Sequence, residues 1–335
     1  CRDLLALHLS LRRQRLLCIR DRNTLSLPVI CAPMFIISGP ELVIAQCKAG
    51  IVGSFPALNA RPQSLLSEWL TTITTELDTY QAANPKAIVS PYAVNLIVHK
   101  SNDRLEDDVN TCIEFKVPII ITSLRALDPS LVERIHAYGG IIFHDVINVR
   151  HAQKAIEVGV DGLVLVCAGA GGHAGTLSPF ALVSEIKQFF DGPIALSGSI
   201  ANGESILSAQ ALGADFAYIG TRFIATKEAN AEQEYKNMLV EHSAKDIVYS
   251  SLFTGVHGNY LKPSITNAGL DPDNLEQGDK NKMKFGSEGG SKSKAWKDIW
   301  GAGQGLGSIA DITDVATIVE RFKTEYDLAL SRLNR

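Results

Sequence analysis

The sequence predicts an α/β protein built as a TIM (β/α)8 barrel. Eight short apolar runs rich in β-branched residues alternate with helical patterns, which is typical of βα units around a parallel sheet. The runs are continuously hydrophobic, as in Ile119-Ile120-Ile121, which indicates strands covered on both faces. A doubly wound open sheet is the alternative, but it usually has fewer strands. Strands are expected at 28–34, 50–55, 87–96, 117–123, 140–146, 162–168, 193–199 and 214–220.

Helices are expected between these runs. Several of them stop at a glycine, as at Gly50, Gly159 and Gly213, because glycine adopts the left-handed conformation that commonly ends a helix. The expected helices occupy 40–48, 62–82, 103–115, 129–138, 148–158, 178–190 and 203–212.

The regular pattern stops after the eighth strand. Residues 236–300 are expected to form an inserted helical and loop subdomain over the barrel mouth, so that the barrel itself comprises 1–235 and 301–335. Within the insertion, 274–297 is rich in Gly, Lys, Ser and Asn and is expected to be a mobile excursion, with its lysines as a solvated surface or an anion-attracting lid. A helical period returns at 309–333 and predicts a closing C-terminal helix.

Composition excludes several classes of function. The formal net charge of −4 provides no basic field, so we expect no nucleic-acid partner. No uncharged apolar segment reaches the about 18 residues needed to span a bilayer, so we expect no membrane span. Six cysteines lack CxxC spacing, which favours reduced thiols in a cytoplasmic protein over a metal site or a disulfide framework.

The first 22 residues are rich in arginine and resemble a transit peptide in that respect. Asp3, Asp21 and the absence of an initiator Met favour instead a trimmed or tagged end that leads into a helix.

The loops after the seventh and eighth strands carry the chemistry of a phosphate site. They read Ser197-Gly198-Ser199 and Gly220-Thr221, where small residues expose main-chain N–H groups and hydroxyls add donors. In a TIM barrel these two loops commonly bind phosphate. Ordinary tight turns are the alternative for either loop alone.

A glycine-rich segment with one histidine follows the sixth strand. Residues 168–176 read Ala-Gly-Ala-Gly-Gly-His-Ala-Gly-Thr. The glycines permit close approach of a flat ligand, and His173 is the group in this segment that can transfer protons near neutral pH. The alternative role is a loop histidine bonded to a main-chain carbonyl.

Four motifs at the ends of expected strands are Ala-Pro-Met at 32–34, Gly-Gly-His-Ala-Gly at 171–175, Ser-Gly-Ser-Ile-Ala at 197–201 and Gly-Thr-Arg-Phe at 220–223. Together they resemble the nitronate monooxygenase family, once called 2-nitropropane dioxygenases. The resemblance extends over 25–225 and resumes at Trp300. It implies an FMN-binding TIM barrel with a histidine beside the flavin ring.

The resemblance also implies roles for individual residues. His173 would be catalytic, either as a neutral base or as a protonated anchor for the bound anion. Apart from the resemblance, His257, Tyr260 and Lys262 in the insertion are candidate substrate contacts, with loop packing and surface charge as the alternative. Some family members carry a lysine after the strand-five histidine, where this chain has Asp145. The expected cofactor-binding residues are Ala32, Pro33, Met34, Asn95, His144, Gly171, Gly172, Ser197, Gly198, Ser199, Gly220, Thr221, Gly303 and Gln304. For His144, a hydrogen-bonded histidine of the core is the alternative.

The activity that the resemblance implies is oxidation of an alkyl nitronate such as propionate 3-nitronate by O2, yielding a carbonyl compound and nitrite. The partners would be a nitronate or nitroalkane and O2, with a homodimer as one assembly. One alternative is an FMN-dependent NAD(P)H:quinone or enoyl reductase on the same barrel. Another, of a different class, is a flavin-free barrel that binds a phosphate ligand or acts as a lyase.

Overall fold

The centre of the protein is a parallel sheet that curls into a barrel. The computed structural model describes residues 25–278 and 298–334; the expected N-terminal helix and most of the lysine-rich stretch lie outside them. The sheet order is β1-β9-β8-β6-β5-β4-β3-β2, and a parallel bridge between Ile30 and Val52 joins the two outer strands. The strands are β1 (Val29–Cys31), β2 (Gly53–Pro56), β3 (Tyr92–Val98), β4 (Ile119–Leu124), β5 (Ile141–Val146), β6 (Gly162–Val166), β8 (Ile194–Ser197) and β9 (Phe216–Ile219). The predicted TIM barrel is confirmed.

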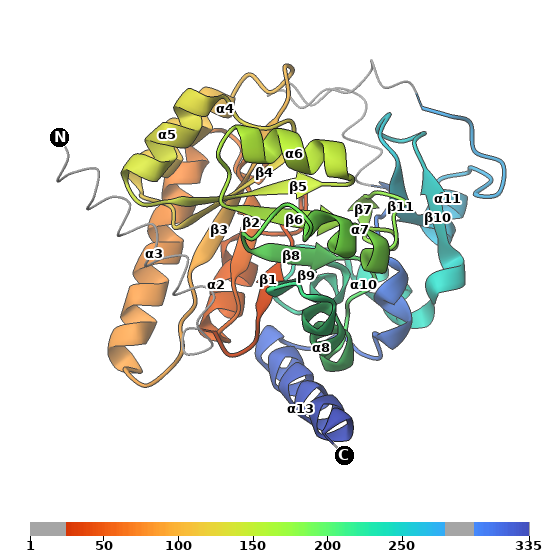
Figure 1. The fold of residues 1–335 in the computed structure, drawn as a ribbon. Helices are drawn as coiled ribbons and strands as arrows, with labels where there is room; N and C mark the ends of the chain where they lie inside the picture. Colours follow the sequence, from red (N-terminus) through yellow and green to blue (C-terminus); the bar gives the residue numbers. More distant parts are fainter. Residues whose placement is uncertain (1–24, 279–297, 335) are drawn as a thin grey trace.

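Helices surround the barrel, as Figure 1 shows. Their C-terminal glycines behave as predicted: Gly50, Gly159 and Gly213 have φ of 82°, 89° and 103°. These values are in the left-handed region, where glycine has no Cβ to clash. The helices are α2 (Pro40–Lys48), α3 (Leu65–Ala83), α4 (Leu105–Glu114), α5 (Pro129–Ala137), α6 (Val149–Glu157), α7 (Pro179–Ile186), α8 (Gly203–Leu212) and α9 (Thr221–Ile224), with the short 3₁₀ turns η1 (Ala57–Asn59), η2 (Ala244–Asp246) and η4 (Gln304–Ser308).

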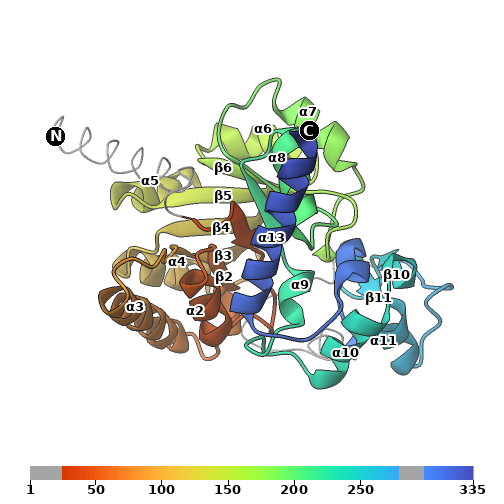
Figure 2. The same cartoon turned by 90° about the horizontal axis from the view of Figure 1, so that it is seen from below.

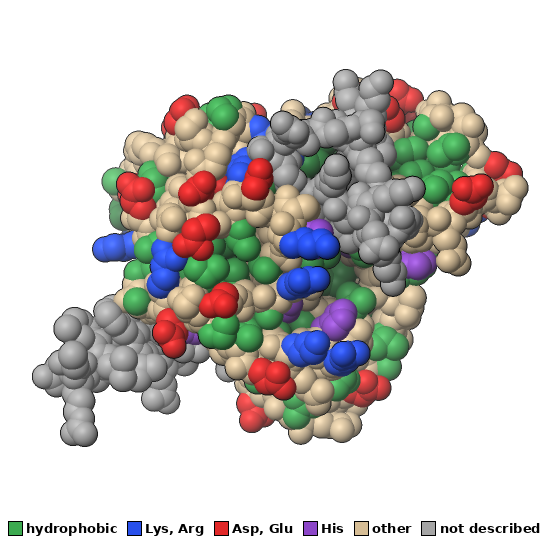
Figure 3. All heavy atoms as spheres, turned by 90° about the horizontal axis from the view of Figure 1, so that it is seen from above, with side chains coloured by type: hydrophobic (Ala, Val, Ile, Leu, Met, Phe, Trp, Pro, Cys, Tyr) green, Lys and Arg blue, Asp and Glu red, His purple; other side chains and the backbone are tan. Residues whose placement is uncertain are grey.

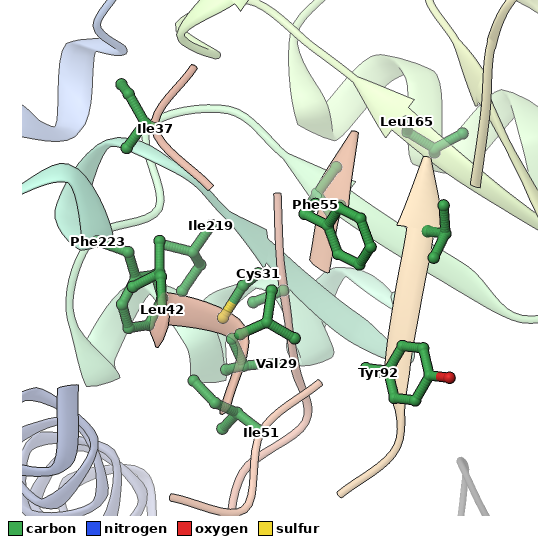
Figure 4. Close-up of a cluster of buried hydrophobic side chains, with 14 of the residues drawn as sticks. Val29, Cys31, Ile37, Leu42, Ile51, Phe55, Tyr92, Leu165, Ile219 and Phe223 are labelled. Carbon is green, nitrogen blue, oxygen red and sulfur yellow. The ribbon is translucent and has the colours of Figure 1, made fainter. Parts of the chain in front are cut away.

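Alternating strand side chains build two hydrophobic cores. On β5, Ile141 and Phe143 belong to the cluster that fills the barrel interior, whereas Ile142 and Val146 pack in the outer cluster between strands and helices. Figure 4 shows part of the outer cluster, where Leu42 of α2 lies beside side chains of β1 and β9. Because successive side chains alternate along a strand, this register decides which polar residues at the strand ends face into the barrel.

The closing helix α13 (Val315–Leu333) lies on the outside of the barrel and contacts α8 and α2 (Figure 2). The Asp314 side chain accepts a hydrogen bond from the Thr317 amide at 2.8 Å and caps its N-terminus. Asp311 bonds both Arg222, which follows β9, and Arg321 of α13, at 2.9 and 2.7 Å. The predicted closing helix is therefore confirmed.

The segment after α10 (Gln233–Glu241) contains strands as well as helix. Strands β10 (Ile247–Ser250) and β11 (Gly258–Leu261) form an antiparallel sheet with β7 (Gly172–His173), and helix α11 (Lys262–Asn267) follows. The insertion is thereby joined to the glycine-rich loop that carries His173.

Charged side chains are unevenly spread on the face seen from above, where Lys, Arg and His gather near the middle (Figure 3). Helix α6 lies on this side and carries exposed Arg150, His151 and Lys154.

Within the described ranges, no helix is long and apolar enough to cross a bilayer. The four described cysteines are free and buried, namely Cys31, Cys47, Cys112 and Cys167.

Candidate active site

The loop with His173 is held by pairing with the insertion. His173 lies opposite Gly258, and Gly172 opposite Asn259, in the β7–β11 ladder. The Asn259 side-chain amide donates to the Ala170 carbonyl at 2.7 Å. Gly172 has φ of 65°, and a Cβ there would meet nothing within 4 Å. Glycine at this position thus permits the left-handed turn and leaves open space beside the histidine.

His173 is half-buried, and its surroundings keep it neutral. Its Nε2 lies 2.9 Å from the hydroxyl oxygen of Thr254. Thr254 has one hydroxyl proton and donates it to the Val256 carbonyl at 2.9 Å, so Thr254 accepts from His173 Nε2–H. Desolvation lowers the pKa of His173 to about 4. At neutral pH the ring is therefore uncharged and can act as a base.

A pocket lies where the loops after β6, β8 and β9 meet the C-terminal segment. Gly198 and Ser199 have φ of 141° and 57°, so the β8 loop turns sharply at this point. Thr221 Oγ1 accepts a hydrogen bond from Gly303 N at 2.9 Å, which leaves the Thr221 hydroxyl proton for a ligand. The pocket is lined by Gly169, Ala170, Gly171, Ser197, Gly198, Ser199, Ile200, Ala201, Tyr218, Gly220, Thr221, Gly303 and Gly305. Gln304, which is exposed, joins this region through a bond from its main-chain N to Gly169 O at 2.9 Å.

The end of β1 lies against the end of β9. A Cβ on Gly220 would be 3.3 Å from Ala32 Cβ and 3.6 Å from Met34 Sδ. The loop that follows Pro33 is held by Asn59, whose amide donates to Met34 O at 3.0 Å. The structure therefore brings the Ala-Pro-Met motif to the loop after β9.

Three polar side chains form a row inside the barrel mouth. Asn95 Nδ2 donates to Ser123 Oγ at 2.7 Å, and Ser123 Oγ donates to Asp145 Oδ2 at 2.6 Å. Burial raises the pKa of Asp145 to about 7. Leu124, next to Ser123, has φ of 76°, an unusual conformation for a leucine and one that is typical of functional sites.

The structure does not bring His144 to the pocket. Its Nδ1 lies 2.6 Å from Thr122 Oγ1. On β5 the side chain of His144 points out of the barrel, whereas those of its sequence neighbours Phe143 and Asp145 point inward. Burial lowers the pKa of His144 to about 4. The residue expected from the sequence as a cofactor contact is thus a buried histidine between sheet and helices, because strand side chains alternate.

The three candidate substrate contacts of the insertion have different surroundings, and Tyr260 interacts with Thr254, the partner of His173. Lys262 forms an ion pair with Asp273 at 2.6 Å. The His257 ring stacks on Tyr249 with centroids 5.0 Å apart, and the Tyr249 hydroxyl donates to Ala174 O at 2.8 Å. Tyr260 is fully buried and packs edge-on against a phenylalanine. The contacts of His257 therefore support the His173 loop, and those of Lys262 do not.

Sequence reasoning missed Thr254, Asn59, Asn259 and Tyr218. Thr254 and Asn259 act across 81 and 89 residues of sequence, so no local pattern signals them. Tyr218 could have been found, because it precedes Gly220 by two positions and therefore faces the same side of β9.

Comparisons with known proteins agree with this architecture. The sequence model of the nitronate monooxygenase family matches residues 19–324. A nitronate monooxygenase of Paraburkholderia phytofirmans is 25% identical over 287 residues, covering 73% of this chain and 76% of that protein. FabK from Thermotoga maritima superposes with a TM-score of 0.74 at 23% identity, covering 94% of this chain and 97% of that chain. For nitroalkane oxidase from Streptomyces ansochromogenes the TM-score is 0.73 at 19% identity, with 93% and 99% covered. At these identities the two structures support the fold.

Proposed function

Given that this chain belongs to the nitronate monooxygenase family and is an oxidoreductase, we propose that it binds FMN and oxidises alkyl nitronates with O2 to a carbonyl compound and nitrite. The observation that carries the proposal is that His173 is neutral and follows, by two residues, Gly171 in the pocket lining.

The residues present fit FMN. Thr221 has a hydroxyl proton available to an anion, and Gly198 and Gly220 add main-chain surface without side chains. Tyr218 lines the pocket, and its buried hydroxyl has no hydrogen-bond partner within the described residues. A buried polar group of this kind commonly contacts a ligand or water. Ala32 and Met34 would contact the ring, and Ser199 and Thr221 the phosphate.

When bound, FMN would accept electrons from the substrate carbanion and transfer them to O2. The protein positions the substrate and controls its proton. Neutral His173, with Nε2–H held by Thr254, can take a proton from the carbon of a neutral nitroalkane. A nitronate is already ionised, so with this substrate His173 would only position the anion. Comparing a nitroalkane with its nitronate therefore separates the role as a base from the role in positioning.

The test uses the purified protein and its visible spectrum. We expect a bound flavin that loses its oxidised absorbance when propionate 3-nitronate is added without O2, and nitrite release when O2 is present. A flavin that is bleached by NADH but unaffected by nitronates would identify a reductase instead. A colourless protein that does not take up FMN would overturn the proposal and favour a flavin-free barrel.

A further inference from the structure

Ser123 and Asp145 at the barrel mouth have no role in the chemistry above, and they form a hydrogen-bonded row with Asn95, an expected cofactor contact. Asn95, Ser123 and Asp145 follow one another on the neighbouring strands β3, β4 and β5. Each lies two positions beyond a residue of the interior cluster, so all three belong to the inward-facing series.

The hydrogen bonds of this row all run in one direction. Asn95 Nδ2 donates to Ser123 Oγ at 2.7 Å and, less closely, to Ile121 O at 3.2 Å. Ser123 in turn donates to Asp145 Oδ2 at 2.6 Å. Both amide hydrogens of Asn95 are thereby used, and its Oδ1 is the atom left to accept a bond from a ligand.

Asp145 would lower the stability of the fold if its role were only structural. Its Oδ1 is buried without a hydrogen-bond partner within the described residues. A buried carboxyl group with one oxygen lacking a hydrogen bond makes the fold less stable than an apolar side chain would at the same position. The Tyr218 hydroxyl is also buried without a hydrogen-bond partner within the described residues, and its pKa is raised by burial first and by the charge of Asp145 second. These two polar atoms without partners, on β5 and β9, indicate that a ligand covers this part of the barrel.

We propose that Ser123 and Asp145 are positioning residues that hold the Asn95 amide with its Oδ1 toward the cofactor, so that the site selects a ring with an imide N–H. The inference rests on the flavin part of the proposed function. The oxidised isoalloxazine ring has one N–H, at N3, so an outward carbonyl oxygen at Asn95 can accept from that atom. A bond from neutral N3–H to Asn95 disfavours loss of the N3 proton.

The experiment is a spectrophotometric pH titration of N3–H in the bound flavin of the holoenzyme. Ser123→Ala breaks the row but keeps the charge of Asp145, whereas Asp145→Asn keeps an acceptor for Ser123 but removes the charge. We expect the N3 pKa to fall by about one pH unit in Ser123→Ala, the size of one hydrogen bond. It should stay near the wild-type value in Asp145→Asn and be restored in Ser123→Thr, which retains the hydroxyl.

The opposite pattern, a fall in Asp145→Asn and none in Ser123→Ala, would mean that Asp145 acts through its charge and would overturn the inference. An unchanged N3 pKa in both variants would overturn it too, even with nitronate oxidation intact. If the wild-type protein binds FMN but oxidises no nitronate, the proposed function fails while the titration still tests the row. A protein that binds no flavin refutes both. Should Ser123→Ala not fold, Ser123→Cys supplies the same comparison.

Discussion

His173 Nε2 lies 2.9 Å from the hydroxyl oxygen of Thr254, although 81 residues separate them in sequence. Thr254 belongs to the inserted segment and His173 to the loop after β6, so the histidine is oriented from outside the barrel. Because Thr254 donates to Val256 O, it fixes the proton of neutral His173 on Nε2.

Replacing Thr254 should therefore remove the preference of neutral His173 for the tautomer with its proton on Nε2. In Thr254→Val the ring proton can occupy either nitrogen, and we expect kcat/KM for a nitroalkane to fall about 3- to 10-fold, the value of one hydrogen bond. Thr254→Ser retains the hydroxyl and should restore the rate. Ring ¹⁵N NMR measures the tautomer directly; an unchanged spectrum in Thr254→Val would show that Thr254 does not set it.

Removing His173 should affect two substrates differently. His173→Asn should keep bound flavin but lower kcat/KM for a neutral nitroalkane by about 10²- to 10⁴-fold, the usual contribution of a general base. The loss for the preformed nitronate should be much smaller. His151→Asn, at an exposed histidine of α6, is the matched control. Equal losses for both substrates would contradict the role as a base.

The pH profile gives an independent check on His173. A base must be uncharged, and burial lowers its pKa to about 4. With a nitroalkane, the His173-dependent part of kcat/KM should be level near neutrality and fall as the pH drops through about 4. A cationic anchor would show the reverse, with activity on the nitronate rising toward pH 4.

Gly171→Ala should weaken cofactor binding. A Cβ at Gly171 would lie 2.8 Å from Gly303 N and 2.9 Å from Thr221 Oγ1, so the hydrogen bond between those two residues must shift. We expect FMN affinity to fall at least about tenfold, equivalent to about 1.4 kcal/mol. Gly39→Ala, where a Cβ meets nothing within 4 Å, should bind FMN normally. Flavin fluorescence on dilution measures the release, and equal affinities would show that this contact does not shape the pocket.

Asp145 should make the flavin-free protein less stable at higher pH. Its folded pKa of about 7 exceeds the value of about 3.9 in an unfolded chain, so the folded state binds more protons between these values. The free energy of unfolding should fall as the pH rises from about 4 to about 7, by roughly 4 kcal/mol at most. Asp145→Asn should remove this contribution. Urea unfolding at several pH values tests it, and identical pH dependence in both proteins would rule it out.

Much of the fold was predictable because its signals are local. The apolar runs on β4 and β6, the glycines that end α2 and α8, and the apolar face of α13 each follow from neighbouring residues. The loops around Ser199 and Thr221 were identified for the same reason, since each follows a strand directly.

The directions of the His144 and Asp145 side chains could not be predicted from local sequence. The two are adjacent on β5, and only the register of the sheet decides that Asp145 lies in the inward series and His144 against Thr122. The bonds to His173 were also beyond the sequence, because β7 pairs with β11 across more than 80 residues.

The sequence by itself thus determined the barrel, the order of its elements and the small-residue loops after β8 and β9, because these depend on hydrophobic periodicity and turn chemistry within short windows. Tertiary structure decided the state of His173 and the neighbours of Asn95. Desolvation and hydrogen bonds between distant segments set a histidine's pKa and tautomer and an amide's orientation, and both exist only once the chain has folded.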